Sequence, residues 1–79
     1  MMNPSDVAAL IEAGLPDAQV RVVSDDNTHY EAVVVSSQFN GKSQVARHQM
    51  VYGTLGQRMG REIHALALKT LTPEESADA

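Results

Sequence analysis

The hydrophobic residues at the start of the chain recur every three or four positions, as on one face of a helix. They are Val7, Leu10, Ile11 and Leu15. Asn3 is a favoured N-cap residue, and Pro4 suits the first helical position. Gly14 followed by Pro16 is typical of a helix end. The pattern therefore predicts a helix that begins at Pro4 and ends near Gly14.

Two short segments rich in β-branched residues follow this helix, at 20–23 and 30–35. Between them lies Ser24-Asp25-Asp26-Asn27-Thr28, a run of side chains that favour turns. The combination predicts an antiparallel hairpin. Residues 36–43 contain Phe39, Asn40 and Gly41 and show no clear period, so they predict an irregular turn before the next helix.

A second helical repeat begins at Gln44 and predicts a helix of roughly four turns that ends at Gly60. Its apolar side is expected to consist of Val45, His48, Tyr52, Leu55 and Met59. Gly53 and Gly56 would each weaken such a helix by up to about 1 kcal/mol relative to alanine. We expect these glycines to let another backbone approach closely.

Residues 63–71 alternate in a way that predicts a strand, with His64 on the same side as Leu66 and Leu68. Thr72-Pro73-Glu74-Glu75 has the residues of a helix start and predicts a short C-terminal helical turn with a fraying tail. The element order is then α-β-β-α-β. It predicts an α+β fold in which the helices pack on one face of a single sheet.

Length and composition limit what the chain can build. Its 79 residues include two tyrosines, one phenylalanine and no tryptophan, so the core must be small and mostly aliphatic. We expect one domain over residues 1–79, with an ordered core at 4–73. The chain has no cysteine, which excludes a disulfide framework and a metal site made of its own thiolates. Acidic residues near the start, without a basic and apolar leader, predict a cytoplasmic protein that does not enter a membrane.

The charges are unevenly spread along the sequence. The net charge is -4, yet residues 32–61 contain no acidic residue. This span holds four of the six basic residues, namely Lys42, Arg47, Arg58 and Arg61. One part of the molecule is therefore expected to be locally positive, although a solvated helix face would give the same pattern.

The sequence lacks the patterns on which enzymes of this size rely. It shows no nucleophile paired with a base, no phosphate-binding loop followed by lysine and serine, and no repeated carboxylate and histidine motif. Asp25 and Asp26 near His29 are more typical of a turn than of an acid and base pair. We therefore expect that the protein is not an enzyme.

Four segments, in order and with matching spacing, resemble the BolA family. They are Thr28-His29-Tyr30, Val35-Ser36-Ser37-Gln38-Phe39-Asn40-Gly41, Arg47-His48-Gln49-Met50-Val51-Tyr52, and 63–74 with its Ile63-His64-Ala65 start. The resemblance covers residues 5–75. It implies a fold like the class II KH domain, with a mixed three-stranded sheet. It also implies an adaptor that binds a monothiol glutaredoxin and shares a 2Fe-2S cluster with it and with glutathione.

In that family complex the glutaredoxin and glutathione supply thiolates, and the BolA protein supplies imidazole. The resemblance places His64 at the family's C-terminal ligand position. A second ligand in many members is a cysteine or histidine in the loop before the second strand, where this chain has Asp26. The short acidic loop is similar to that of the IbaG-like (YrbA) branch. Asp26 could itself offer an oxygen ligand, although iron-sulphur centres favour sulphur and nitrogen over oxygen. His29, which is close by in sequence, is the alternative second ligand.

Each histidine also has a purely structural interpretation. His64 could pack at the edge of the core, because it shares the side of Leu66 and Leu68. His29 could simply support its strand. His48 lies on the expected apolar side of the second helix, and we interpret it, with Tyr52, as structural. If His29 and His64 meet at one end of the sheet, a partner on the second ring nitrogen would fix the tautomer.

Nucleic-acid binding by a transcriptional regulator is the alternative function, with DNA or RNA as the partner. Lys42, Arg47, Arg58 and Arg61 could contact phosphates, and Gly53-Thr54-Leu55-Gly56 matches the G-x-x-G string of KH domains. The string falls inside a predicted helix rather than a loop, and the net charge is negative, so the sequence favours the adaptor. It leaves open the identity of the glutaredoxin, a homodimer of the free chain, and a role in cluster transfer, iron sensing or the stress response.

Overall fold

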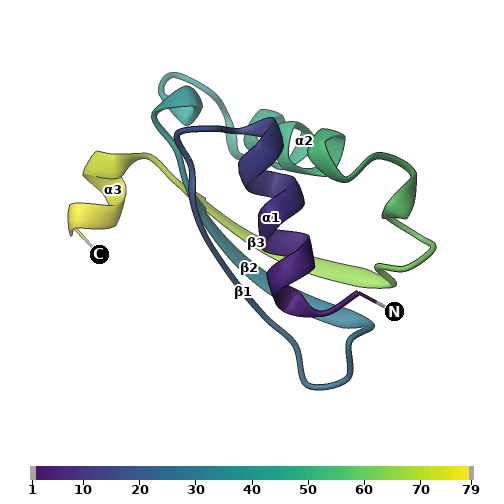
Figure 1. The fold of residues 1–79 in the computed structure, drawn as a ribbon. Helices are drawn as coiled ribbons and strands as arrows, with labels where there is room; N and C mark the ends of the chain where they lie inside the picture. Colours follow the sequence, from purple (N-terminus) through teal and green to yellow (C-terminus); the bar gives the residue numbers. More distant parts are fainter. Residues whose placement is uncertain (1, 79) are drawn as a thin grey trace.

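A three-stranded sheet with helices against one of its faces organises the chain, as Figure 1 shows. The computed structural model describes residues 2–78. The helices are α1 (Pro4–Gly14), α2 (Gln44–Leu55) and α3 (Pro73–Asp78), and the strands are β1 (Gln19–Val23), β2 (His29–Val35) and β3 (Ala65–Leu71). Two short 3-10 turns, Ser37–Phe39 and Gly56–Arg58, precede and follow α2. The expected α-β-β-α-β order and the short C-terminal helix are confirmed.

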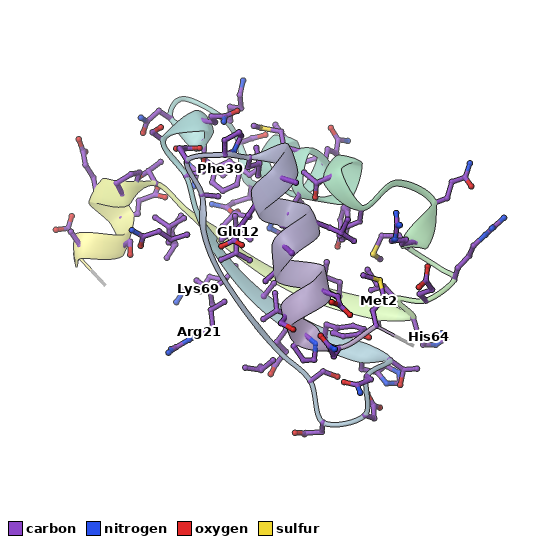
Figure 2. The ribbon with its side chains drawn as sticks, in the orientation of Figure 1. Met2, Glu12, Arg21, Phe39, His64 and Lys69 are labelled. Carbon is purple, nitrogen blue, oxygen red and sulfur yellow. The ribbon has the colours of Figure 1, made fainter. Side chains whose placement is uncertain are left out.

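The sheet is mixed, with β2 in its centre. β1 pairs with β2 antiparallel, as expected of a hairpin, and β3 pairs with β2 parallel. Val33 of β2 is aligned with Arg21 on one side and with Lys69 on the other. Figure 2 shows these two basic side chains pointing away from the helices. The sheet thus has one face covered by α1 and α2 and one face that the described helices leave open.

The core fills the space between α1, α2 and the sheet. Its fully buried members include Val7 and Ile11 of α1, Val34 of β2, Phe39 of the first 3-10 turn and Leu55 of α2. All are aliphatic except Phe39, in agreement with the composition. Asn3 caps α1 through its side chain, which accepts a hydrogen bond from the Asp6 N–H at 3.1 Å. The first helix therefore begins and ends where the pattern predicts.

The buried face of α2 differs from the prediction. Its buried residues are Arg47, Val51 and Leu55, whereas Val45 is 68% exposed and Tyr52 36% exposed. The helix also ends at Leu55 rather than near Gly60, because Gly56 has a positive φ of 56°. The predicted apolar side was correct at Leu55 and wrong at Val45, His48 and Tyr52. The difference arises because the long side chain of Arg47, a residue that a hydrophobic pattern counts as polar, occupies the inner face.

The close approach between helices lies at Gly14, not at the glycines of α2. A methyl group on Gly14 would stand 2.4 Å from Cγ2 and 2.8 Å from Cβ of Thr54. Nothing lies within 4 Å of a corresponding methyl group at Gly53 or Gly56. The expectation that Gly53 and Gly56 admit another backbone is therefore wrong. Gly14 instead allows α1 to cross α2 closely.

Gly14→Ala is expected to lower the free energy of unfolding by about 1–3 kcal/mol, since the new methyl group overpacks the α1 and α2 contact. Rotation of the Thr54 side chain would not relieve the overlap, because its Cβ is also too close. Urea unfolding measures the change. The matched control is Gly53→Ala, which should stabilise the fold by about 0.5–1 kcal/mol through helix propensity. Equal effects of the two substitutions would contradict the packing that we describe.

Within residues 2–78, no helix combines the length and the apolar character needed to span a lipid bilayer.

Candidate functional site

Parallel pairing of β2 and β3 brings His29 and His64 to the same end of the sheet. His29 is the first residue of β2, and it is aligned with Ala65, the first residue of β3. His64 directly precedes that strand, and its backbone N–H donates to the carbonyl oxygen of Thr28 at 2.9 Å. Figure 2 shows His64 at the end of the sheet where β3 begins. Thirty-five positions apart in sequence, the two histidines become neighbours.

The two imidazole rings contact each other edge to face. Their centroids are 5.1 Å apart, and the ring planes make an angle of 78°. Both residues are exposed. Two imidazoles on one tetrahedral metal ion, with metal to nitrogen bonds of about 2.0–2.1 Å, have centroids about 5 Å apart. The observed separation therefore meets the distance condition for two nitrogen ligands on a single ion.

Asp26 organises the turn that carries His29. Its Oδ1 accepts hydrogen bonds from the backbone N–H of Thr28 at 3.0 Å and of His29 at 2.9 Å. Its Oδ2 lies 2.8 Å from the ring Nδ1 of His29. The first of these bonds is an Asx turn, in which an aspartate side chain bonds the backbone two residues on. One carboxylate therefore shapes the loop and holds the histidine ring.

These hydrogen bonds also keep Asp26 ionised. The backbone N–H of His29, the His29 ring and the backbone N–H of Thr28 lower the pKa of the Asp26 carboxyl well below its usual range, in that order of size. An ionised carboxylate only accepts hydrogen bonds. The ring nitrogen that faces it, Nδ1 of His29, must therefore carry the proton.

Neighbouring residues fix the rest of this turn. The Ser24 hydroxyl donates to the carbonyl oxygen of His29 at 2.6 Å and accepts from the N–H of Asn27 at 3.0 Å. Asn27 has a positive φ of 58°, a conformation that asparagine tolerates better than most residues. The buried hydroxyl of Tyr30 contacts the carbonyl oxygens of Asn27, at 2.6 Å, and of Met2. Burial raises the pKa of Tyr30.

The structure separates the interpretations of the three histidines. His64 lies one residue outside β3 and is exposed. It therefore does not pack at the edge of the core, although the alternating pattern placed it on the same side as Leu66 and Leu68. His29 is also exposed, and 62% of its side-chain surface is accessible. His48 is only half-buried, so it is not part of the core of α2. Tyr52 fits its structural interpretation, because its hydroxyl donates to the Leu66 carbonyl oxygen at 3.3 Å.

Of the four predicted basic contact residues, Lys42, Arg58 and Arg61 are exposed and Arg47 is not. Arg47 is 6% exposed and forms an ion pair with Glu75 of α3 at 2.7 Å. Its expected role as a surface contact is therefore wrong. Arg58 lies 3.8 Å from the carboxylate of Glu62. Folding thus brings a distant acidic residue, Glu75, to Arg47, whereas Glu62 simply follows the span in sequence.

The link between Asp26 and His29 is the part of the site that sequence reasoning missed. Both oxygens of Asp26, the oxygen ligand that the sequence offers, instead accept hydrogen bonds from the N–H groups of the turn and of the His29 ring. The sequence signal that could have indicated this link is an aspartate three positions before a histidine within a predicted turn. A depression of about 390 Å³ opens beside this pair, against Ala65 and Ala67 of β3.

The donor set at this end of the sheet is compatible with part of a metal or cluster site. Imidazole nitrogen is a suitable ligand for iron, copper and zinc. Among the described residues there is no group of three or more histidine, cysteine or acidic side chains arranged around a metal position. The two imidazoles amount to half of a four-ligand set.

Comparisons with known proteins agree with the fold and the motifs. The model of the family described as BolA-like protein matches residues 11–75. An uncharacterized protein of Acinetobacter guillouiae, from the rpoN-murA intergenic region, is 35% identical over 94% of this chain and 89% of its own length. The Escherichia coli protein named DNA-binding transcriptional regulator BolA is 39% identical over 68% of this chain and 51% of its own length.

A solved structure shows the same architecture. That of a bolA protein homologue from Coxiella burnetii superposes with a TM-score of 0.87 at 42% identity, covering 98% of this chain and 99% of the other. Among the curated relatives, the matched part spans only 35% of the human BolA-like protein 1 and about half of the Escherichia coli protein.

Proposed function

The chain belongs to the BolA-like family, and from this premise we propose that it is an adaptor in iron-sulphur cluster handling that binds a monothiol glutaredoxin. The observation that carries the proposal is the pair of exposed imidazoles, His29 and His64, held 5.1 Å apart at one end of the sheet. The short acidic loop agrees with the IbaG-like branch of the family.

The proposed division of ligands follows from the chemistry of each partner. A 2Fe-2S cluster takes four protein ligands, and in Rieske centres two histidines replace two cysteines on one iron. His64, with His29 beside it, would offer nitrogen to such a cluster, while the glutaredoxin and its glutathione would offer the thiolates that this chain lacks. Asp26 is not a ligand in this proposal, because its oxygens already accept hydrogen bonds from the turn.

The surface around His64 supports a partner that carries anionic groups. Arg58 and Arg61 are exposed and lie on the connection from α2 to β3, which leads directly to His64. This connection is folded, since the N–H of Ile63 donates to the Arg58 carbonyl oxygen at 3.0 Å. Arg61, together with Arg58 despite its 3.8 Å contact with Glu62, would favour the carboxylates of glutathione bound to a glutaredoxin.

Adding the chain to a cluster-loaded monothiol glutaredoxin is expected to change the visible absorption and circular dichroism of the cluster. The reason is that imidazole would replace another ligand on iron, and cluster spectra depend on ligand type. The mixture should also elute as a complex of one copy of each protein. An unchanged spectrum and separate elution at concentrations of both proteins well above those of the cell would reject the proposal.

Nucleic-acid binding remains the second candidate, because relatives such as the Escherichia coli protein are named as DNA-binding transcriptional regulators. Of its four predicted contact residues, the structure leaves Lys42, Arg58 and Arg61 exposed and buries Arg47. The Gly53-Thr54-Leu55-Gly56 string lies at the end of α2, and Leu55 within it is 1% exposed. This string therefore does not have the loop form that grips a phosphate backbone in KH domains.

A further inference from the structure

We propose that Asp26 is the positioning residue of the histidine pair: it holds His29 with its proton on Nδ1, so that Nε2 of His29 and the ring of His64 can bind one metal ion together. This inference rests on the proposed ligand role of the two histidines. It adds a function for a residue that touches no metal itself, and it predicts metal binding by the chain without a partner protein.

The first support is the hydrogen bond at Nδ1. A neutral imidazole has one N–H and one free nitrogen, and the hydrogen bond of one nitrogen decides which nitrogen remains free. Nδ1 of His29 faces the ionised Asp26 carboxylate at 2.8 Å, so the proton resides there. Nε2 is then left with a lone pair. Metal-bound histidines commonly donate their other N–H to a carboxylate in this way.

The second support is that Asp26 is itself fixed. Its other oxygen accepts two backbone N–H groups, those of Thr28 and His29. The Ser24 hydroxyl and the Asn27 backbone complete the turn on either side. A carboxylate with so many contacts has little freedom to rotate. It therefore imposes one orientation on the His29 ring, even though that ring is largely exposed.

The third support is the position of the second ring. His64 is held by the hydrogen bond of its N–H to Thr28, the same residue whose own N–H binds Asp26. Its ring centroid stands 5.1 Å from that of His29, close to the separation of about 5 Å that two imidazoles adopt on a tetrahedral ion. One carboxylate and one turn thus orient the His29 ring, and the pairing of β2 and β3 places the backbone of His64 beside it.

Asp26→Asn is the variant that tests the role of Asp26. The amide oxygen can still accept the two backbone N–H groups, which keeps the turn. The amide nitrogen would then face Nδ1 of His29. Because an amide N–H only donates, it can form a hydrogen bond with Nδ1 only when Nδ1 carries no proton. The His29 ring should therefore change to the tautomer that carries its proton on Nε2, which blocks that nitrogen for metal. The matched control is Asp25→Asn, which removes the same charge from an exposed neighbour.

Nitrogen NMR of the imidazoles in the metal-free chain reads the tautomer directly, at a pH where both rings are neutral. We expect Nδ1–H for His29 in the wild type and in Asp25→Asn, and Nε2–H in Asp26→Asn. Titration with Zn²⁺ alone should then show one ion per chain, with both rings perturbed together. Affinity should fall by about 10–100-fold in Asp26→Asn and by less than about threefold in Asp25→Asn, since an exposed charge contributes little.

The inference is overturned if wild-type His29 carries its proton on Nε2, or if Asp26→Asn binds Zn²⁺ as tightly as Asp25→Asn. The tautomer of the wild type decides the question even if Asp26→Asn does not fold. Because no glutaredoxin is present, this result is separate from the proposed adaptor function. A chain with the expected tautomer and zinc affinity that left glutaredoxin spectra unchanged would retain the inference and lose the adaptor proposal.

Discussion

Replacing His64 with alanine is expected to abolish the change in the visible spectrum that the wild-type chain causes in a cluster-loaded glutaredoxin. Loss of a residue that only supports a metal ligand commonly costs 10–100-fold in metal affinity, so loss of the ligand should cost at least about tenfold. The exposure of His64 means that the fold should be little affected, with a change below about 0.5 kcal/mol in the free energy of unfolding.

Two further histidine variants make this result specific. His48→Ala removes the same side chain from a half-buried position on α2, outside the pair, and should leave the spectral change intact. His29→Ala removes the second imidazole of the pair and should weaken the effect if both rings bind the cluster. A spectral change that persists in His64→Ala at wild-type size would show that this residue is not a ligand.

Arg47→Ala is expected to destabilise the fold by about 2–4 kcal/mol, because a buried charge network would lose its centre. The guanidinium group donates to the carbonyl oxygens of Lys42, at 2.9 Å, and of Thr70, at 3.3 Å. It also pairs with Glu75, whose side chain is 45% exposed. Because Glu75 can regain water in the variant, the loss of stability should be smaller than for a fully buried ion pair. The guanidinium carbon lies 5.9 Å from the centre of the Phe39 ring.

The Arg47 variant also discriminates between the two candidate functions. Arg58→Ala is its matched control, because Arg58 is exposed and its pair with Glu62 is long at 3.8 Å. The control should change the free energy of unfolding by less than about 0.5 kcal/mol. Urea unfolding gives both values. If Arg47→Ala were as stable as Arg58→Ala but lost salt-dependent retention of DNA, the burial of Arg47 would be contradicted and nucleic-acid binding would be favoured.

The order of the elements could be predicted because local signals are strong at their ends. The Asn3 cap, Pro4 and Gly14 bound α1, and the turn residues 24–28 bound the hairpin. The period of residues 44–59 indicated a helix correctly but its buried side wrongly. Burial of Arg47 depends on Glu75, 28 positions away, and a helical period contains no information about such a partner.

The candidate site was predictable only in part, because its residue types are visible in the sequence and its contacts are not. The family resemblance indicated His64, and proximity in sequence to the loop position indicated His29. The exposure of both residues agrees with an accessible site. The hydrogen bonds of Asp26 to the turn and to His29 could not be predicted, because a sequence does not show which donors a carboxylate binds. Gly53 and Gly56 were selected for close packing from composition alone, while the actual contact at Gly14 requires the crossing of α1 and α2.

The sequence by itself determined the elements, their order, the absence of thiolate ligands and the residues able to bind metal through nitrogen. Those properties depend on residue type and on neighbours within a few positions. Only the tertiary structure decided that β3 lies parallel to β2, which places His64 beside His29, and that Arg47 is buried while Arg58 is exposed. These outcomes depend on contacts between residues 28 to 36 positions apart, which form only when the sheet and its helices pack together.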